Sequence, residues 1–382
     1  MNIILNLESL RPPVTGIGVY TQQLVKGLQA HPAISSLYCF TDSGLVDPMQ
    51  ATEQSGNRAG YALRRFLRRL PFAYQIRSSV RSFMFRRRTA NIRDAIYHEP
   101  SFVLKPYDGL CVATIHDLSY IHYAKYHPVE RVKYLEREIP KTLKKVAHII
   151  TDSTYVRREI IDILGVPEEK VTSIPLGVDK RFFPRKRNEL APILARYGLQ
   201  DTKYLLLVGT LEPRKNFDGM ILAYSRLPNV LRSRHPLVHV GPQGWCAKPT
   251  EKAFDALMRS GQARRIGYAS SDDMAYFYAG AHAFAFPSIY EGFGLPLLEA
   301  MASGVPVLSS NRSSMPEVLG DAGLLVNPED IDALTGALVK LLSDDEFRES
   351  SIRKGKMQVK HFQWEDCVDK TVNVYQELRG MI

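Results

Sequence analysis

The sequence predicts an α/β protein built from two parallel sheets, each covered by helices on both faces. Three observations support this fold class. Short apolar runs without polar alternation recur along the chain, and longer helical patterns lie between them. This alternation occurs twice, with a charged, proline-containing break near residues 179–200. The chain, at 382 residues, is also long for a single hydrophobic core, so two domains are expected.

The individual elements follow from the apolar runs and from the amphipathic stretches between them. In the first half, strands are expected at 3–7, 37–40, 95–98, 110–115, 148–151 and 171–174, with helices at 19–28, 128–145 and 154–164. In the second half, strands are expected at 204–208, 237–240, 264–266, 283–286, 305–308 and 323–326, with helices at 330–342 and 345–361.

These elements predict two Rossmann-like domains whose parallel sheets face a central cleft. We expect an N-terminal domain at 1–180, a linker at 181–200 and a C-terminal domain at 201–360. Residues 361–382 are expected to form a helix that packs back on the N-terminal domain. Because ligands of open α/β sheets bind beyond the carboxyl ends of the strands, residues of the functional site should follow strands.

The net charge of +10 comes from one segment. Residues 58–93 contain eleven arginines and no aspartate or glutamate, so this segment carries +11 and leaves −1 for the rest of the chain. Within residues 61–70, apolar side chains recur at helical spacing, Pro71 follows, and residues 72–83 continue a similar pattern. A basic amphipathic helix of this kind docks on an anionic membrane surface or is an ordinary helix with a solvated basic face.

The cysteines and the N-terminus indicate a cytoplasmic protein. The four cysteines are far apart and form no C-x-x-C pair, which argues against a disulfide framework or a structural metal. The chain begins with a short apolar run that resembles a first strand more than a signal peptide. Peripheral association with the inner face of the membrane remains an expectation from the arginine segment alone.

The most informative stretch is residues 286–308. Glu291 precedes a turn flanked by Gly292 and Gly294, and Pro296 suits the first turn of a following helix. Glu299 lies eight residues after Glu291, so the two carboxylates can face the same side of a site. The free amides at the helix start can hold a phosphate, and flanking carboxylates can bind hydroxyls. A nucleotide-sugar presents both groups.

A second informative segment, residues 209–217, directly follows a predicted strand. Its adjacent Arg214 and Lys215 provide a forked donor and a point charge that together can neutralise a diphosphate. Alone, such a pair is more often a solvated basic pair before a helix. The Glu291 segment farther along the same domain favours the functional interpretation.

These two motifs resemble those of the retaining GT-B glycosyltransferases of family 4. The resemblance extends over nearly the full chain and is most specific in the second half. It implies that residues 1–180 form the acceptor-side domain and that 201–360 bind the nucleotide-sugar. The sequence Glu-Pro-Arg-Lys-Asn at 212–216 is frequent among bacterial mannosyltransferases of this family that use GDP-mannose.

The resemblance also implies roles for individual residues of the second half. Glu299 matches the carboxylate that binds the ribose hydroxyls, and Glu291 matches the carboxylate near the reacting face of the donor sugar. Arg214 and Lys215 match the diphosphate clamp. Three backbone amides at the helix start match contacts to the phosphate and the sugar, namely those of Phe293, Gly294 and Leu295.

In the first half, two further sites follow predicted strands. Gly16 and Gly18 match the family's glycine-rich loop, which lets backbone approach the donor and the acceptor. His116 matches the histidine that contacts the donor sugar, and we expect Asp117 to be its polar partner. Asp152 and Ser153 are interpreted chiefly as a helix N-cap.

The leading interpretation is therefore a hexosyltransferase that moves mannose from GDP-mannose onto a saccharide hydroxyl, with retention, as in O-antigen or polysaccharide assembly. The acceptor is expected to be lipid-linked. GDP-rhamnose and a UDP-sugar remain alternative donors. Two alternatives come from other classes: a nucleic-acid-binding protein that uses residues 58–93, and a glycoside hydrolase that uses Glu291 and Glu299. Against nucleic-acid binding, the chain has no excess of positive charge outside residues 58–93. Against hydrolysis, a glycoside hydrolase has no need for an Arg-Lys pair that binds a diphosphate.

No cofactor and no metal are expected. The D-x-D at Asp330 and Asp332 opens a predicted helix, where aspartates commonly serve as caps. No pair of side chains stands out as nucleophile and base. This agrees with a mechanism in which the leaving phosphate helps to deprotonate the acceptor.

Overall fold

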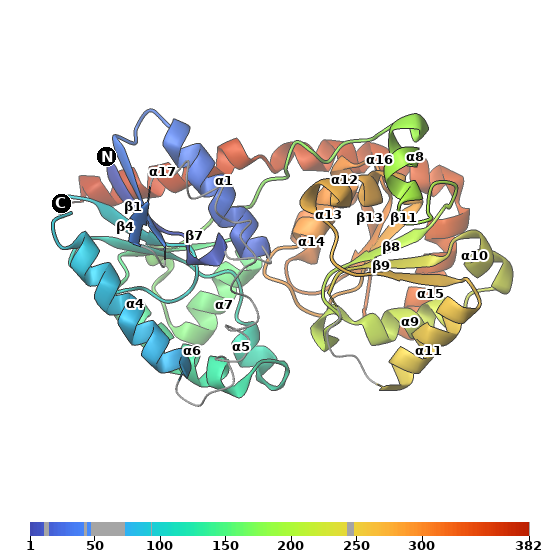
Figure 1. The fold of residues 1–382 in the computed structure, drawn as a ribbon, viewed down its shortest axis with the longest axis horizontal. Coiled ribbons are helices and arrows are strands. Elements are labelled where there is room, and N and C mark those ends of the chain that lie inside the picture. Colours follow the sequence, from blue (N-terminus) through green and yellow to red (C-terminus); the bar gives the residue numbers. More distant parts are fainter. Residues whose placement is uncertain (11–14, 42–43, 47–72, 93, 243–247, 382) are drawn as a thin grey trace. The chain divides into compact units, whose positions relative to one another are not determined.

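A computed structural model describes residues 1–10, 15–41, 44–46, 73–92, 94–242 and 248–381, with only the backbone of 73–79. The chain divides into two compact units (Figure 1). The N-terminal unit comprises Met1–Leu176 and Trp364–Ile382, and the C-terminal unit comprises Gly177–Gln363. The basic helix expected at 61–70 lies outside the described residues.

The N-terminal unit contains a seven-stranded sheet in the order β3-β2-β1-β4-β5-β6-β7. Every pairing is parallel except that of β3 with β2. The strands are β1 (Asn2–Asn6), β2 (Ser36–Thr41), β3 (Gly44–Val46), β4 (Ile96–Glu99), β5 (Cys111–Thr114), β6 (His148–Thr151) and β7 (Val171–Ser173). The short β3 was not expected from the sequence.

The helices of this unit cover the sheet. They are α1 (Gly16–Ala30), α4 (Ala73–Thr89), α5 (Ser119–His122), α6 (Val129–Lys145), α7 (Thr154–Leu164) and α17 (Trp364–Gly380), with short 3₁₀ turns at Glu8–Leu10, Ala124–Tyr126 and Glu168–Lys170. Their apolar faces form two cores. One joins β5 and β6 to α6 and α7, and the other places Phe85 of α4 against Phe40 and Tyr97 of the sheet.

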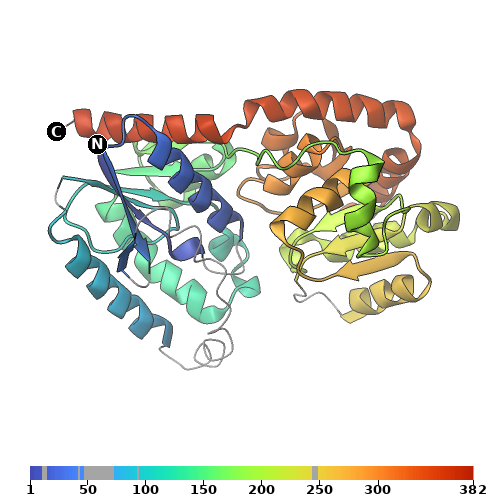
Figure 2. The ribbon, with the colours of Figure 1, turned by 45° about the horizontal axis from the view of Figure 1, so that its top comes forward.

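The C-terminal helix α17 packs beside α1 of the same unit (Figure 2). Gly27 of α1 makes this approach close, since a Cβ there would lie 2.3 Å from a methyl carbon of Val368. Farther along α17, Tyr375 is hydrogen-bonded to His98 at 2.5 Å, and His98 contacts the Thr114 hydroxyl at 2.8 Å. These buried contacts fix α17 to the carboxyl-terminal ends of β4 and β5.

The C-terminal unit contains a six-stranded, fully parallel sheet in the order β10-β9-β8-β11-β12-β13. The strands are β8 (Leu205–Val208), β9 (Leu237–Val240), β10 (Ala263–Ile266), β11 (Ala283–Phe286), β12 (Val307–Ser310) and β13 (Gly323–Val326). Each lies within two residues of its expected position. Together, the two parallel sheets confirm the predicted α/β class and the Rossmann-like architecture of both units.

Helices lie on both faces of this sheet (Figure 1). They are α8 (Arg187–Ala195), α9 (Phe217–Ser225), α10 (Asn229–Arg234), α11 (Lys248–Arg259), α12 (Ser271–Gly280), α13 (Leu295–Ala302), α14 (Met315–Leu319), α15 (Ile331–Ser343) and α16 (Asp345–Gln358), with 3₁₀ turns at Pro213–Lys215 and Val359–His361. Helices α9, α11 and α15 share one apolar core with the sheet.

The expectation of a linker at 181–200 is wrong for most of that range. These residues belong to the C-terminal unit and include α8. Leu194 and Leu199 are buried in that unit, and α8 packs against α12. The high density of charged residues around these leucines obscured the helix in the sequence.

Candidate functional site

The strand order of the C-terminal unit places the two strongest motifs next to each other. From β8 the chain continues to β9 and β10 on one side of β8, and then crosses to β11 on the other side of β8. The direction of the strand order therefore reverses between β8 and β11, which makes this the topological switch point of the sheet. Ligands of doubly wound sheets bind at this point. The loop after β8 carries Arg214 and Lys215, and the loop after β11 carries Glu291.

Glu291 lies between the two cations. Nη1 of Arg214 donates to Oε2 of Glu291 at 2.7 Å, and Nζ of Lys215 donates to Oε1 at 2.8 Å. The Ser288 hydroxyl also donates to Oε1, at 3.0 Å. Each carboxylate oxygen therefore accepts a charge-assisted hydrogen bond, the stronger kind of protein hydrogen bond.

The electrostatics of this cluster favour the carboxylate form of Glu291. Its side chain is only 12% exposed, and burial alone would raise its pKa. The charges of Arg214 and Lys215 outweigh burial and lower the pKa of Glu291 to about 2. Glu291 is consequently ionised at neutral pH and can serve as a fixed negative charge or as a hydrogen-bond acceptor.

Neighbouring groups fix Arg214 in turn. Its Nη1 donates to the Tyr290 carbonyl at 2.9 Å, and its Nη2 donates to Glu212 at 3.0 Å. Glu212 is therefore a further acidic member of the cluster. The sequence motif Glu-Pro-Arg-Lys-Asn at 212–216 contains this residue, but its contact with Arg214 depends on how the 3₁₀ turn at Pro213–Lys215 folds.

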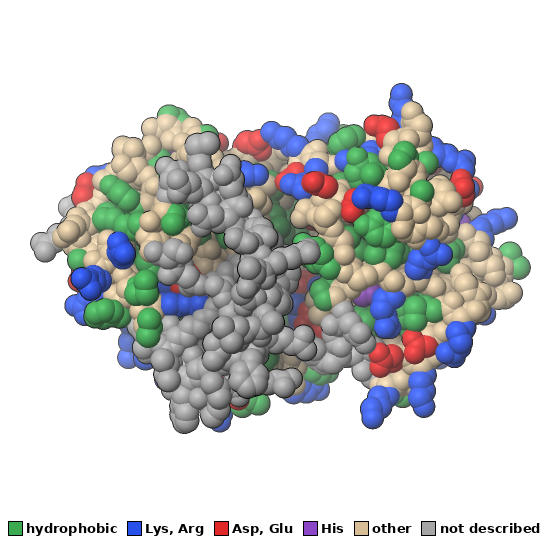
Figure 3. Space-filling model, in the orientation of Figure 1, with side chains coloured by type: hydrophobic (Ala, Val, Ile, Leu, Met, Phe, Trp, Pro, Cys, Tyr) green, Lys and Arg blue, Asp and Glu red, His purple; other side chains and the backbone are tan. Residues whose placement is uncertain are grey.

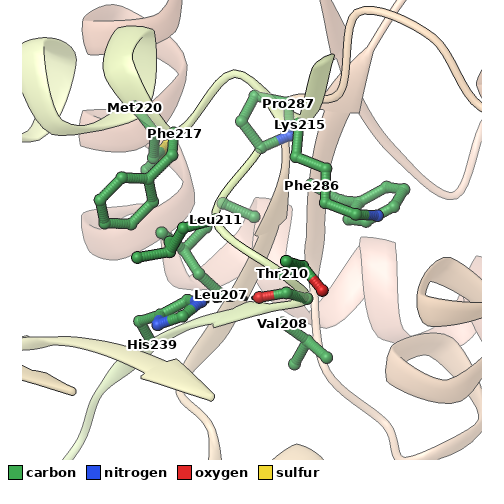
Figure 4. Close-up of a pocket in the computed structure, with 12 residues that line it drawn as sticks. Leu207, Val208, Thr210, Leu211, Lys215, Phe217, Met220, His239, Phe286 and Pro287 are labelled. Carbon is green, nitrogen blue, oxygen red and sulfur yellow. Dashed lines mark hydrogen bonds between the residues drawn. The ribbon is translucent and has the colours of Figure 1, made fainter. Parts of the chain in front are cut away.

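Lys215 borders a small pocket at the end of β8 (Figure 4). Its Nζ lies 5.1 Å from the centre of the Phe286 ring. Gly209 adopts a φ of +128°, and a Cβ there would lie 3.1 Å from Cδ of Lys215. A glycine at this position thus permits both the turn after β8 and the close passage of the lysine side chain.

Two serines after β12 support the backbone of the Glu291 loop. The Glu291 amide donates to Ser313 Oγ at 3.0 Å, and the Ser314 hydroxyl donates to the carbonyls of Glu291 and Phe293 at 2.9 and 2.7 Å. Our sequence analysis missed both residues. Their only signal in the sequence was a position a few residues after the strand predicted at 305–308; the pairing of this strand with β11 is known from the structure alone.

The turn after Glu291 leads into α13 as expected. Gly294 is the N-cap of α13 with a φ of +117°, a conformation that favours glycine, and Pro296 lies in the first turn. Leu295 is the first helical residue, and Phe293 is buried with its ring 5.9 Å from that of Phe362. The backbone amides at this helix start are the groups predicted to contact phosphate.

Glu299 lies one turn into α13 and experiences different surroundings from Glu291. Burial raises the pKa of Glu299 from its ordinary 4.5 to about 7, although the Tyr278 hydroxyl acts in the opposite direction. The charges of Asp179 and Arg181 act on it as well, with opposite signs. Glu299 therefore keeps its proton to a higher pH than an exposed glutamate does.

In the N-terminal unit, the loops after three adjacent strands bring His116 and Asp152 together. Nδ1 of His116 lies 2.6 Å from Oδ2 of Asp152, and Nε2 lies 2.8 Å from the carbonyl of Pro100. Pro100, His116 and Asp152 follow β4, β5 and β6. Burial opposes the imidazolium, but Asp152 outweighs it and raises the pKa of His116.

This geometry corrects the expected partner of His116. Asp117 does not contact it through a hydrogen bond; its carboxylate instead accepts from the Ser119 amide at 2.9 Å. Asp152 was interpreted chiefly as a helix cap, yet the N-cap of α7 is Ser153, which accepts from the Val156 amide. The correct pairing depends on the adjacency of β5 and β6, which the sequence does not state.

Gly16 and Gly18 lie within the first turn of α1 and do not form a separate glycine loop. Thr15 is the N-cap, and Gly18 is buried. Neither glycine has a positive φ, so the backbone conformation does not itself require glycine at these two positions. The expectation of a loop at Gly16 and Gly18 is corrected accordingly, and residues 11–14 lie outside the description.

Within the described ranges, no group of three or more His, Cys, Asp or Glu side chains could hold a metal ion. Asp330 accepts from the Ala333 amide at 2.9 Å as the N-cap of α15, and Asp332 pairs with Arg226 at 2.6 Å. No helix in the described part of the chain is long and apolar enough to cross a membrane.

Comparison with protein families finds two matches that together span most of the chain. The family described as Glycosyltransferase Family 4 matches residues 14–182, and the family described as Glycosyl transferases group 1 matches residues 193–358. The first covers most of the N-terminal unit, and the second covers most of the C-terminal unit with the Arg214, Lys215 and Glu291 cluster.

Similar proteins of named activity include two mannosyltransferases. O-antigen chain mannosyltransferase B of Escherichia coli is 38% identical over 384 residues, which cover 99% of this chain and 100% of the relative. MMP alpha-(1->4)-mannosyltransferase of Mycolicibacterium hassiacum is 31% identical over 254 residues, which cover 65% of this chain and 57% of the relative.

Solved structures support the fold. Sucrose-phosphate synthase from Thermosynechococcus elongatus superposes with a TM-score of 0.76 at 19% identity and covers all of both chains. WaaG, a glycosyltransferase involved in lipopolysaccharide biosynthesis, superposes with a TM-score of 0.66 at 15% identity, covering 98% of this chain and 99% of that chain. At such identities these structures show the shared GT-B fold and nothing about the substrate.

Proposed function

Because this chain belongs to glycosyltransferase family 4 and is a glycosyltransferase, we propose that it transfers mannose from GDP-mannose to a hydroxyl of a lipid-linked saccharide. The anomeric configuration is retained. The observation that carries the choice of sugar is the full-length likeness to O-antigen chain mannosyltransferase B. The family assignment sets aside the hydrolase and nucleic-acid alternatives.

The proposed donor site is the switch point of the C-terminal unit. Lys215 and Arg214 bind the diphosphate and stabilise the charge that develops on it as the sugar leaves. Their present partner, Glu291, is an acceptor of two cationic donors. A diphosphate offers the same cations more negative charge, so it can take over part of their hydrogen bonding while Glu291 turns toward sugar hydroxyls.

The remaining donor contacts follow from α13 and from His116. The amides around Phe293, Gly294 and Leu295 bind phosphate oxygens at the positive end of the helix. Glu299 accepts hydrogen bonds from the ribose hydroxyls, and His116 contacts the donor sugar. Both ring nitrogens of His116 are hydrogen-bonded in this structure, Nδ1 to Asp152 and Nε2 to the Pro100 carbonyl. In this proposal, contact with the sugar exchanges the Pro100 carbonyl for a sugar hydroxyl at Nε2.

The proposed reaction breaks the bond between the anomeric carbon and the diphosphate oxygen and forms a bond from that carbon to the acceptor oxygen on the same face. The proton of the acceptor hydroxyl passes to the leaving phosphate oxygen. No side chain is required as a nucleophile in this proposal, and neither a metal nor a cofactor takes part.

A donor panel tests the proposal. The purified chain is incubated with GDP-mannose, GDP-rhamnose or UDP-glucose and a mannose-terminated acceptor, with and without EDTA, and the product is analysed by NMR. We expect transfer from GDP-mannose alone, unchanged by EDTA, with an α-linked product. Transfer only from a UDP-sugar would overturn the donor, and a product of inverted configuration would overturn the mechanism.

A further inference from the structure

The three residues from Pro100 to Phe102, directly after β4, occupy one ring nitrogen of His116. The Pro100 carbonyl lies 2.8 Å from Nε2 of His116, and because a carbonyl can only accept, Nε2 carries the proton. His116 is 6% exposed, and little histidine surface is visible on the face drawn in Figure 3. A ligand can therefore bind Nε2 only if the Pro100 carbonyl gives way. We call these three residues the 100–102 segment.

The 100–102 segment has a strained backbone. Phe102 has a φ of +60°, and the Val103 amide donates to the Ser101 carbonyl at 2.7 Å. This hydrogen bond closes a three-residue γ-turn with Phe102 at its centre, and the form of this turn with a positive central φ is rare and strained. A left-handed φ is unfavourable for any residue with a Cβ and makes a bulky residue an outlier.

Contacts on both sides hold the segment in this conformation. The buried Glu99 accepts from the Ser101 amide at 3.1 Å, and the Thr114 carbonyl of β5 accepts from the Phe102 amide at 3.1 Å. The Phe102 ring is buried and lies 5.9 Å from the His116 ring. Backbone strain persists only where the surroundings over-determine it, and such positions cluster at ligand clamps and switches.

Core packing explains only part of this arrangement. It accounts for a phenylalanine at position 102, since the ring joins the apolar core that links β5 and β6 to α6 and α7. It does not account for the strained turn, because glycine supplies a positive φ without strain, as Gly165 does after α7. The strain lies in the segment whose carbonyl occupies the nitrogen that the proposed function gives to the donor sugar.

We propose that the 100–102 segment is a strained latch, whose Pro100 carbonyl holds Nε2 of His116 in the free protein and gives way when the donor sugar binds. The inference rests on the proposed function, which assigns Nε2 to a sugar hydroxyl. Opening lets Phe102 leave the left-handed region, so relief of its strain offsets part of the lost hydrogen bond. Phe102 is thus a positioning residue that acts through His116.

Glycine and alanine at position 102 separate strain from packing, because both remove the ring and only alanine keeps the strain. Relative to the open state, the latched state should be about fivefold to 30-fold more populated in Phe102→Gly than in Phe102→Ala. NMR with isotope-labelled histidine measures exchange of the His116 Nε2 proton with solvent, which should be slower by that factor in Phe102→Gly. This measurement requires neither donor nor acceptor.

Calorimetry gives a second readout. GDP-mannose should bind Phe102→Gly up to about 30-fold more weakly than Phe102→Ala, because its sugar competes with a more stable latch. GDP carries no sugar beyond its ribose, so its affinity should be the same in both variants.

The matched control is Gly165→Ala. Gly165 has a φ of +65° at the far end of α7, with nothing within 4 Å of an added Cβ. The change therefore adds left-handed strain of the same kind to the same unit. It should lower the melting temperature and leave the His116 exchange rate and both affinities unchanged.

Equal exchange of the Nε2 proton in the two variants of position 102 would overturn the latch, as would an equal, measurable affinity for GDP-mannose. Slower exchange in Phe102→Gly, with no binding of GDP-mannose even to the wild type, would support the latch and overturn the proposed donor. If neither variant folds, the wild type decides. GDP-mannose but not GDP should then shift the NMR signals of the Phe102 amide and the His116 ring, and identical spectra with the two bound ligands would overturn the proposal.

Discussion

Lys215 Nζ lies 2.8 Å from Oε1 of Glu291, across the switch point between the loops that follow β8 and β11. The same carboxylate accepts from Arg214 through its other oxygen. A carboxylate thus holds the two cations that the proposed function assigns to the donor diphosphate. This contact keeps the cations in place, and it also means that a diphosphate and Glu291 share the same donors.

Neutralising Glu291 should separate donor binding from turnover. In Glu291→Gln the side chain keeps a hydrogen-bond acceptor but no longer competes as an anion for Lys215 and Arg214. We expect GDP affinity to stay the same or increase, while kcat falls about 100-fold or more because the charge near the sugar is lost. Calorimetry with GDP and a steady-state assay measure the two effects. A large loss of GDP affinity with normal kcat would be incompatible with this role.

Removing Arg214 should destabilise the C-terminal unit. Both members of its pair with Glu291 are mostly buried, at 15% and 12% exposure, and Arg214→Ala leaves the carboxylate with fewer donors. We expect the free energy of unfolding to fall by about 1–3 kcal/mol. Arg226→Ala is the matched control, because its pair with Asp332 is exposed and should contribute less than about 1 kcal/mol. Equal effects in urea denaturation would contradict the description of the cluster.

Gly294 tests the helix start. Its φ of +117° is unfavourable for any residue with a Cβ, so Gly294→Ala should destabilise the fold by about 1–2 kcal/mol and weaken GDP binding. Gly336 in α15 has open space around it, so Gly336→Ala should stabilise by about 0.5–1 kcal/mol. Thermal denaturation of both variants checks the opposite signs. A destabilising effect of Gly336→Ala would contradict the open space around this position in α15.

The raised pKa of Glu299 predicts a pH dependence of stability. Between pH 4.5 and about 7 the folded state keeps the Glu299 proton that the unfolded state has released, so Glu299 lowers the free energy of unfolding as pH rises through that window. Glu299→Gln removes this dependence. The stability of the variant minus that of the wild type should therefore increase from pH 5 to pH 8. A stability difference that stays constant from pH 5 to pH 8 would show that the pKa of Glu299 is not raised in the folded state.

The pKa values of His116 and His98 should be shifted in opposite directions from that of an exposed histidine. Asp152 raises the pKa of His116 despite burial, whereas burial lowers the pKa of His98 to about 3. NMR of the imidazole signals should find a pKa above 6.5 for His116 and a neutral His98 at pH 5. In Asp152→Asn the pKa of His116 should fall below its ordinary value, since burial then dominates. An unchanged His116 titration in this variant would refute the pairing.

The sequence predicted the architecture well because its signals are local. Apolar runs located twelve strands, and the Pro296 turn located the start of α13. Contacts that depend on strand adjacency were out of reach. The pairing of His116 with Asp152 joins residues 36 positions apart, and the hydroxyl of Ser314 reaches the Glu291 carbonyl across β11 and β12. The sequence pattern also failed to predict α8, because charged residues surround its buried Leu194 and leave no clear apolar periodicity.

The most direct test of the diphosphate site is the dissociation constant of GDP for Lys215→Met, measured by titration calorimetry beside Lys252→Met, which removes an exposed lysine of α11. Loss of a charged hydrogen bond should weaken GDP binding about tenfold to a hundredfold in Lys215→Met and leave Lys252→Met like the wild type. Equal affinity in all three proteins would contradict the assignment of the donor diphosphate to the loops after β8 and β11.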